Sequence, residues 1–194
     1  MLKNHLEKYN IILASASPRR KQLLEELEIP FKVQTKNVKE TFPADLKPEE
    51  VAAYLSKLKA NAFLEDELDE RSLIITADTI VTLEGEILGK PVDRPDAIQI
   101  LQRLSGKKHQ VITGVSLRSK QKQITFSVST DVYFKQLSSA EIDFYVDTFK
   151  PYDKAGAYGI QEWIGHAAIE KIEGSYFNVM GLPTHRLYEE LSLF

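Results

Sequence analysis

Two adjacent arginines, Arg19 and Arg20, follow Ser17-Pro18 in the run LASASPRR. Serine is a preferred N-cap and proline is favoured at the first helical position, so we expect a helix that begins at Pro18. Cations in a first helical turn oppose the positive end of the helix dipole. A bound anion removes this conflict, because backbone N–H groups, the hydroxyls of Ser15 and Ser17 and two guanidinium groups would together hold a phosphate chain. The alternative is a solvated basic helix start, and the spacing alone does not decide between the two.

Asp78 is a single carboxylate within the apolar, strand-forming run LIITADTIVTL at residues 73–83. Burying a carboxylate costs free energy unless it is paired, hydrogen-bonded or bound to a metal. A carboxylate in such a place is a candidate general base or metal ligand. The alternative is an aspartate that caps the end of a strand or a turn.

Three further charged residues allow two interpretations each. Lys59 falls at the edge of the apolar stripe of an expected helix, between Leu55 and Phe63. Either its aliphatic stem covers the core while its ammonium stays in water, or the ammonium reaches into a site. Lys90 in the LGKP segment and Glu40 in the loop after the second expected strand are ambiguous in the same way.

Two glycine-containing segments, KAGAYGIQ (154–161) and GSYFNVMGLP (174–183), permit tight turns and a close approach of the backbone to a ligand. Four side chains in them are candidates to contact a nucleotide base by stacking or amide hydrogen bonds: Tyr158, Gln161, Tyr176 and Asn178. The alternative is simple turn chemistry in a strand-rich region.

Hydrophobic patterning predicts an α/β fold with antiparallel strands in its middle. We expect strands at residues 10–14, 31–35, 73–77, 109–117 and 124–134, and helices at 18–29, 48–68, 94–105 and 138–148. Glu84-Gly85 indicates a hairpin turn, and Ser138 with Glu141 indicates a capping box. The chain contains no internal repeat and no Gly/Ser-rich linker, so we expect one domain over residues 1–194.

Composition narrows the classes of protein. The 194 residues are 43% hydrophobic and 27% charged, which is typical of a globular protein with a substantial core. The formal net charge of −3 argues against broad nucleic-acid binding. No apolar run approaches the ~18 residues of a membrane span, and the N-terminus lacks the apolar stretch of a signal peptide, so we expect a cytoplasmic protein without membrane contact.

Composition also narrows the kinds of metal site. The absence of cysteine excludes disulfides, thiol nucleophiles, iron–sulfur clusters and cysteine-ligated zinc. The four histidines, His5, His109, His166 and His185, are too scattered for a paired-histidine motif on one helix. We therefore expect any metal to be held by oxygen, which favours Mg²⁺ or Mn²⁺.

Seven segments, in order along the chain, together resemble the Maf-type nucleotide pyrophosphatases. They are LASASPRR (13–20), Lys59-Ala60, ITADTIV (75–81), LGKP (88–91), HQVITGV (109–115), DKAGAYGIQ (153–161) and GSYFNVMGLP (174–183). The resemblance implies an elongated mixed sheet with flanking helices and a long antiparallel hairpin region, similar to inosine triphosphatase. It also implies metal-dependent hydrolysis of nucleoside triphosphates between the α and β phosphates, with homodimers in several members.

The resemblance assigns roles to individual residues. The proton-accepting aspartate of the family's ADT motif falls on Asp78. The phosphate-binding and charged pocket residues fall on Ser15, Arg19, Arg20, Glu40, Lys59 and Lys90. Because the attacked phosphorus is surrounded by negative oxygens, catalysis depends on neutralising charge and fixing geometry. We expect the arginines and lysines to supply the counter-charge, and Glu40 with Asp78 to hold a Mg²⁺ or Mn²⁺ ion.

The branch of this family that acts on dTTP and UTP is the most similar. Its specificity positions fall on Arg19, Thr79 and Gln161, and all three residues match. The sister branch that acts on 7-methyl-GTP usually differs there and ranks second. One departure is visible, since the family often has Asp-Glu where this chain has Lys39-Glu40.

Two other classes of protein stay open at this point. A nucleotide-sensing regulator of cell division would bind a nucleotide without hydrolysing it, and it would have no need for an acid buried among apolar strands. A nucleic-acid-binding protein is disfavoured by the negative net charge and by the lack of a basic and aromatic stripe.

Overall fold

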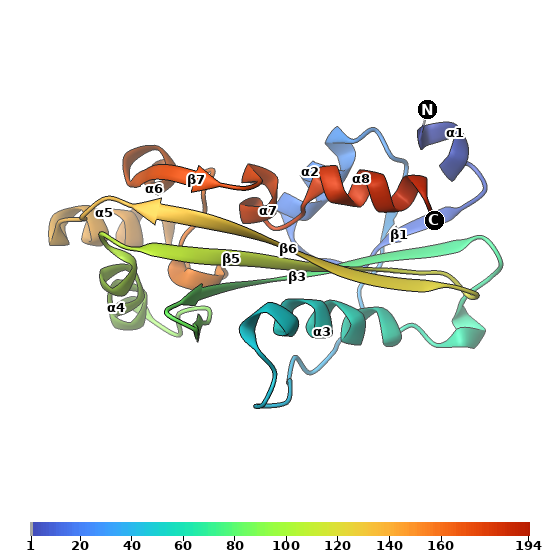
Figure 1. Ribbon diagram of the computed structural model, residues 1–194, viewed down its shortest axis with the longest axis horizontal. Coiled ribbons are helices and arrows are strands. Elements are labelled where there is room, and N and C mark those ends of the chain that lie inside the picture. The colour runs from blue at the N-terminus through green and yellow to red at the C-terminus, as the bar shows by residue number, and fades with distance from the viewer. Residues whose placement is uncertain (1) are drawn as a thin grey trace. The chain divides into compact units, whose positions relative to one another are not determined.

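The computed structural model describes residues 2–194, which form a mixed α/β fold (Figure 1). The strands are β1 (Asn10–Leu13), β2 (Lys32–Val33), β3 (Ser72–Leu83), β4 (Glu86–Leu88), β5 (Lys108–Arg118), β6 (Gln123–Phe134) and β7 (Ile169–Glu173). The α-helices are α1 (Leu2–Leu6), α2 (Pro18–Glu26), α3 (Pro48–Asn61), α4 (Arg94–Leu104), α5 (Ser139–Phe149), α6 (Trp163–Ala167), α7 (Tyr176–Met180) and α8 (Thr184–Ser192). Short 3₁₀ helices lie at η1 (Glu65–Glu67) and η2 (Ala155–Ala157).

The strands belong to a seven-stranded mixed sheet, whose hydrogen-bonded neighbours follow the order β2-β1-β3-β5-β6-β7, with β4 paired to β3. β1 runs parallel to β2 and β3, whereas β4 is antiparallel to β3 and β7 is antiparallel to β6. β5 and β6 are neighbours joined by a turn, in which the Ser119 N–H donates to the Lys122 carbonyl at 2.8 Å. The predicted α/β class and the long hairpin are therefore confirmed.

The hairpin between β3 and β4 turns at Glu84 and Gly85, as predicted. Their φ angles are 53° and 85°. Two successive positive φ angles are those of a type I′ turn, whose twist matches that of the flanking strands. Glycine adopts such an angle without the steric cost that a side chain imposes.

Residue contacts divide the chain into two compact units. Unit 1 contains the chain up to Asp78 together with Thr113–Val128 and Gly181–Phe194. Unit 2 contains Thr79–Ile112 and Ser129–Met180. β3, β5 and β6 each contribute one part to each unit.

In unit 1, α3 packs directly on the sheet. The buried residues of this helix are Val51, Ala52, Leu55, Ser56 and Ala60. A Cβ atom on Gly114 of β5 would lie 2.2 Å from the backbone of Ala52, so only glycine allows this approach. The Thr76 hydroxyl on β3 also donates to the Ser56 carbonyl at 2.7 Å, which anchors the middle of α3 to that strand.

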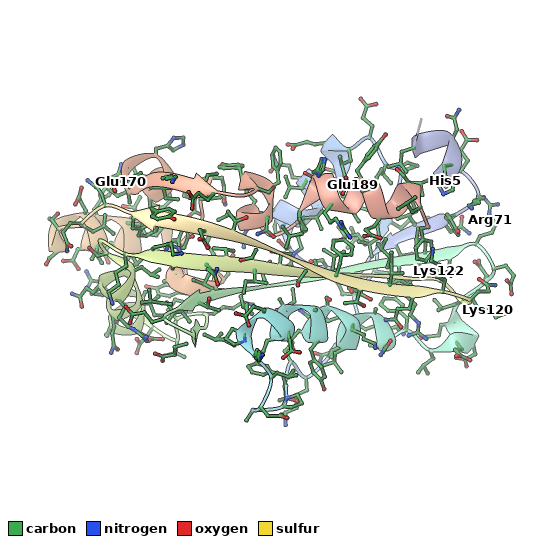
Figure 2. The ribbon with its side chains drawn as sticks, in the orientation of Figure 1. His5, Arg71, Lys120, Lys122, Glu170 and Glu189 are labelled. Atoms are coloured by element: carbon green, nitrogen blue, oxygen red, sulfur yellow. The ribbon has the colours of Figure 1, made fainter. Side chains whose placement is uncertain are left out.

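The other face of the unit 1 strands carries α2 and α8, opposite α3 (Figure 1). The Arg20 Nε atom on α2 donates to the Gly181 carbonyl at 2.8 Å, just before α8. At the start of β3, Arg71 donates to the carbonyls of Lys8 and Glu7 at 3.0 and 2.9 Å, and Figure 2 labels its side chain. These bonds connect segments that are far apart in the sequence.

In unit 2, α4 and α5 are joined by ion pairs. Arg94 contacts both Asp143 and Asp147 at 2.7 Å. The predicted capping box at the start of α5 is present, because the Ser138 hydroxyl accepts from the Glu141 N–H and the Glu141 carboxylate accepts from the Ser138 N–H. Lys135 and these Ser138 bonds lower the pKa of Glu141 to about 2.

Two predicted boundaries are wrong, for reasons that lie in packing. The helix from Pro48 ends at Asn61 and not near residue 68. Phe63 and Leu68 enter a buried cluster with Ala14 and Ile74, and a turn after Asn61 brings both into it. The strand expected at 73–77 continues to Leu83, so Asp78 lies in the middle of a strand and does not cap its end.

The C-terminal region was expected to be strand-rich, and this prediction is also wrong. Residues 163–192 contain three short helices and one strand, β7. Helices this short are marginal in water and depend on tertiary packing, so their sequences carry a weak periodic signal. No helix within residues 2–194 is both long enough and apolar enough to span a membrane.

Candidate active site

Lys59, Asp78 and Glu40 form an ion cluster in unit 1, named here the Lys59 cluster. The Lys59 ammonium donates to Asp78 Oδ1 at 2.5 Å and lies 2.9 Å from Glu40 Oε1. The side chains of Lys59 and Asp78 are 17% and 11% exposed, whereas that of Glu40 is 47% exposed. The cluster is therefore shielded on the sheet side and open to solvent at Glu40.

The local structure explains why Lys59 and Asp78 meet. Thr76 and Asp78 are two residues apart on β3, so their side chains leave the same face of the strand. Ser56 and Lys59 are three residues apart on α3 and share one helix face. The bond from Thr76 to the Ser56 carbonyl sets the register of the helix on the strand, and Lys59 then falls opposite Asp78.

Ser15, Ser17 and Arg20 form a second polar group at the start of α2. Ser17 is the N-cap, as predicted, and its hydroxyl accepts from the Arg20 N–H at 3.4 Å. The buried Ser15 hydroxyl accepts from the Ser17 N–H at 3.3 Å and from Arg20 Nη1 at 3.4 Å. A backbone amide, two hydroxyls and a guanidinium are thus gathered at a helix N-terminus, which is the arrangement expected of an anion site.

The charged residues at the start of α2 interact electrostatically with those of the Lys59 cluster. Burial lowers the pKa of the Arg20 guanidinium, and neighbouring Arg19 lowers it further. The fields of Asp78 and Glu40 act in the opposite direction. An arginine remains charged in a protein at any ordinary pH, so Arg20 contributes positive charge beside the two carboxylates.

The predicted site residues of unit 2 lie on β3 and on two loops. Thr79 is partly buried on β3, and Lys90 is exposed in the loop after β4. The Gly156 N–H donates to the Gly89 carbonyl at 3.1 Å, which links the LGKP segment to the segment 154–161. In that segment, Gln161 Oε1 is buried and has no hydrogen-bond partner among residues 2–194.

Two candidates for base contact are core residues of unit 2. Tyr158 is 6% exposed, and its hydroxyl is hydrogen-bonded to His109 Nε2 at 2.8 Å. Asn178 is fully buried and donates to the Val111 carbonyl and the Thr130 hydroxyl at 3.0 and 2.9 Å. Both side chains are engaged inside the core of unit 2, which neither interpretation of the sequence predicted, whereas Tyr176 is 38% exposed.

A polar group that sequence reasoning missed lies beside Gln161. Lys154 and Glu162 form an ion pair at 3.1 Å, and the Tyr145 hydroxyl donates to Glu162 Oε2. Lys154 lies within a predicted motif, but an isolated lysine before Ala155 and Gly156 gives no sign of burial. Glu162 and Tyr145 are 17 residues apart, so no local pattern connects them.

The donor set fits a hard divalent cation. Glu40 and Asp78 bring two carboxylates to the same ammonium, and carboxylate oxygen is the ligand that Mg²⁺ and Mn²⁺ prefer. Within residues 2–194 no group of three or more His, Asp or Glu side chains is placed to hold a metal. Mg²⁺ commonly binds through one or two carboxylates together with substrate phosphates and water, so two carboxylates suffice.

Comparison with known proteins identifies relatives over nearly the full length. The family model described as Maf-like protein matches residues 10–194. A dTTP/UTP pyrophosphatase of Phocaeicola vulgatus is 55% identical over 98% of each chain. A dTTP/UTP pyrophosphatase of Christiangramia forsetii is 52% identical over 98% of this chain and 97% of its own length.

Among solved structures, the Staphylococcus aureus Ham1 protein aligns with a TM-score of 0.46. It is 15% identical, and the alignment covers 64% of this chain and 71% of that chain. This likeness is too slight to bear on function. The family match over residues 10–194 and the identities above 50% show that the chain belongs to the Maf-like protein family.

Proposed function

We propose that this chain is a nucleoside triphosphate pyrophosphatase that hydrolyses dTTP and UTP to the monophosphate and pyrophosphate. Relatives with that name cover nearly the whole chain at more than half identity, which supports one catalytic domain over residues 1–194. The observation that carries the proposal is Asp78, a carboxylate in the middle of a buried strand that is held by Lys59.

Asp78 is the proposed catalytic base, which orients a water molecule and accepts its proton. Burying the Asp78 carboxylate in a sheet costs free energy, and the ion pair with Lys59 offsets this cost. The pair does not contribute to the hydrophobic core. A group kept at such a cost is a functional candidate. Transfer of a proton to a positioned side chain contributes typically ~10²–10⁴-fold to a rate.

The negative triphosphate requires positive charge and hydrogen-bond donors around it. We assign phosphate binding to Ser15, Arg19, Arg20, Lys59 and Lys90. Ser15 and Arg20 are supported by their place at the N-terminus of α2. Lys59 is supported by its position between the two carboxylates, since it offsets part of their negative charge while leaving Glu40 open to solvent.

Glu40 and Asp78 are the proposed ligands of a divalent cation, Mg²⁺ or Mn²⁺. These two carboxylates would hold the ion, which would supply Lewis-acid polarisation of the attacked phosphoryl group. Lys39 precedes Glu40, so this loop offers one carboxylate to the ion and Asp78 offers the other. We expect the remaining coordination positions to be filled by phosphate and water.

We assign recognition of the base to Arg19, Thr79 and Gln161. Gln161 Oε1 is a buried acceptor without a partner among residues 2–194, and such an atom is costly unless a ligand pairs with it. Uracil and thymine carry an N–H at ring position 3, whereas cytosine carries a bare acceptor there. A buried amide oxygen therefore favours the two substrates and disfavours CTP.

The proposal also covers the location and the oligomeric state of the protein. Nucleoside triphosphates are made in the cytoplasm, so we place the protein there. Similarity to family members that dimerise supports a homodimer. Light scattering of the purified protein tests the homodimer directly.

The first experiment measures pyrophosphate release from dTTP, UTP, CTP and 7-methyl-GTP with Mg²⁺ or Mn²⁺. We expect pyrophosphate from dTTP and UTP, and a loss of at least ~100-fold in kcat for Asp78→Asn. Asp131→Asn is the matched control, because Asp131 also lies on a strand and pairs with a lysine, Lys108, at 3.0 Å. This control should keep its activity.

Three outcomes would overturn the proposal or part of it. Near-normal turnover of Asp78→Asn would remove Asp78 from catalysis. Activity on 7-methyl-GTP alone would move the chain to the sister branch. Tight nucleotide binding without any pyrophosphate release would identify a nucleotide-sensing regulator.

A further inference from the structure

Lys154, Glu162 and Tyr145 form a buried polar group in unit 2, named here the Glu162 cluster. Glu162 Oε1 pairs with the Lys154 ammonium at 3.1 Å, and Glu162 Oε2 accepts from the Tyr145 hydroxyl. That hydroxyl in turn accepts from the Gly159 N–H at 3.0 Å. The side chains of Lys154 and Glu162 are 8% and 18% exposed, and Tyr145 is fully buried.

Glu162 is held in one orientation, because both of its carboxylate oxygens are engaged. It lies at the N-cap position of α6, yet its side chain makes no capping bond and is directed into the cluster. Burial and the neighbouring Glu162 carboxylate raise the pKa of the Tyr145 hydroxyl, so the hydroxyl stays protonated and acts as a donor. A fully satisfied buried network of this kind is rigid.

The cluster touches Gln161 at Gly159. A Cβ atom on Gly159 would lie 3.0 Å from Glu162 Cδ and 3.1 Å from both Lys154 Cε and Gln161 Nε2. The three side chains therefore converge over the bare Cα of this glycine. The Gln161 amide nitrogen thus shares this space with Lys154 and Glu162, while Gln161 Oε1 is buried and unpartnered among the described residues.

We propose that the Glu162 cluster is a positioning device that fixes the Gln161 amide with its oxygen available to the N–H at ring position 3 of uracil or thymine. Its members are positioning residues, since they act through Gln161 and do not contact the substrate. The inference rests on the proposed function and deepens it. It assigns discrimination against cytosine to the rigidity of the Gln161 amide as well as to its identity.

The same three residue types recur on the surface of unit 2 and supply matched controls. The Tyr133 hydroxyl donates to Glu173 Oε2 at 2.7 Å, and Lys171 pairs with Glu173 Oε1 at 2.5 Å. Lys171 and Glu173 are 57% and 49% exposed. Tyr133→Phe and Glu173→Gln thus remove the same kinds of bond without disturbing a buried group.

The test compares Tyr145→Phe and Glu162→Gln with these two controls. The readouts are kcat and KM for UTP and CTP, together with the affinities of the non-hydrolysable α,β-methylene analogues of both nucleotides. We expect the preference for UTP over CTP to fall about tenfold, roughly the effect of one misplaced hydrogen bond, mainly through a raised KM for UTP. The controls should keep the wild-type preference.

Gly159→Ala provides a second route, because its methyl group displaces the three converging side chains and leaves their charges intact. It should lower the same preference. An unchanged preference in Tyr145→Phe and Gly159→Ala, with only a lower melting temperature, would show a merely structural cluster and overturn the inference. So would a wild-type protein that binds the two analogues equally.

Failure of the proposed function would look different. If the wild-type protein releases no pyrophosphate but still binds the UTP analogue more tightly than the CTP analogue, the proposed reaction fails. The comparison of analogue affinities between variants and controls then still decides whether the Glu162 cluster positions Gln161.

Discussion

Two lysines, Lys59 in unit 1 and Lys154 in unit 2, each lie between two carboxylates. Lys59 pairs with Asp78 and Glu40 at 2.5 and 2.9 Å, and Lys154 pairs with Asp153 and Glu162 at 2.7 and 3.1 Å. The clusters differ in what surrounds the less exposed carboxylate. Both lysines also pair with an exposed carboxylate, Glu40 at 47% and Asp153 at 62%. Glu162 in addition accepts from the buried Tyr145 hydroxyl, whereas Asp78 lies in the field of the Arg20 guanidinium on α2.

This difference separates two uses of a lysine–carboxylate ion pair. A closed cluster has both oxygens of its carboxylate satisfied inside the protein and serves to fix neighbouring atoms. A cluster whose buried carboxylate lies beside an arginine at a helix N-terminus, as Asp78 does beside Arg20, is placed to act on a bound phosphate. Breaking the first should therefore show mainly in stability and selectivity, and breaking the second mainly in turnover.

Lys59→Met should produce the largest effect. It removes the charge that Asp78 and Glu40 share, and we expect kcat/KM for dTTP to fall roughly 10²–10³-fold, as for loss of one preorganised donor. Pyrophosphate release measures the change. Lys57→Met is the control, since Lys57 is exposed on the same helix, and equal losses in both variants would contradict the role given to Lys59.

Lys154→Met should mainly destabilise the protein. It leaves Glu162 charged, largely buried and without its cation, and breaking a buried pair from one side costs roughly 3 kcal/mol. Urea unfolding measures the loss. In a double-mutant cycle, Glu162→Gln should recover part of it, because the uncompensated charge is then gone. A strictly additive cycle would speak against coupling of the pair.

We expect low pH to destabilise the protein through His109 of unit 2, which is 1% exposed. Burial lowers the pKa of His109 to about 4, so between about pH 6.5 and 4 the unfolded chain binds a proton that the folded chain does not. Stability must then fall as the pH falls through this window. The contribution between about pH 7.5 and 5 is roughly 2 kcal/mol.

Urea unfolding at several pH values, compared between wild type and His109→Phe, tests this expectation. The variant should lose less stability in acid than the wild-type protein. His185→Gln is the control, because the His185 side chain is 85% exposed, and it should follow the wild-type profile. Identical profiles for all three proteins would exclude His109 as the titrating group.

Lys171→Met should have the smallest effect. It removes the counter-charge of Glu173 and repeats at the surface the change made at Lys154. Exposed ion pairs contribute little, because water solvates the remaining partner. We expect no change in the urea midpoint or in the preference for UTP over CTP. A loss comparable to that of Lys154→Met would show that burial does not distinguish the two groups.

Local chemistry made much of the fold predictable. The cap at Ser17-Pro18, the Glu84-Gly85 turn and the capping box at Ser138 involve residues at most three positions apart, and each forms as expected. The long strands β5 and β6 were also recognised from their alternation. Predictions that depended on where a hydrophobic residue finally packs were wrong, as at the end of α3, where Phe63 leaves the helix for the core.

The candidate site was predictable as a set of residues but not as an arrangement. The motifs singled out Asp78, Lys59 and Glu40, yet each had a plausible structural alternative. The pairing became visible only when the Thr76 bond placed α3 on β3. Glu162 and Tyr145 carried no signal, because nothing in a sequence marks an ordinary glutamate or tyrosine as buried.

The sequence by itself determined the caps, the turns, the strand-forming runs and the membership of the family. The interactions that stabilise the caps and turns join residues close together in the chain. The family is recognisable because its motifs are short, continuous segments of sequence. The tertiary structure alone decided that Lys59 meets Asp78 and that Tyr145 closes over Glu162. These contacts join residues 19 and 17 positions apart, so they exist only once helices and strands have packed in one register.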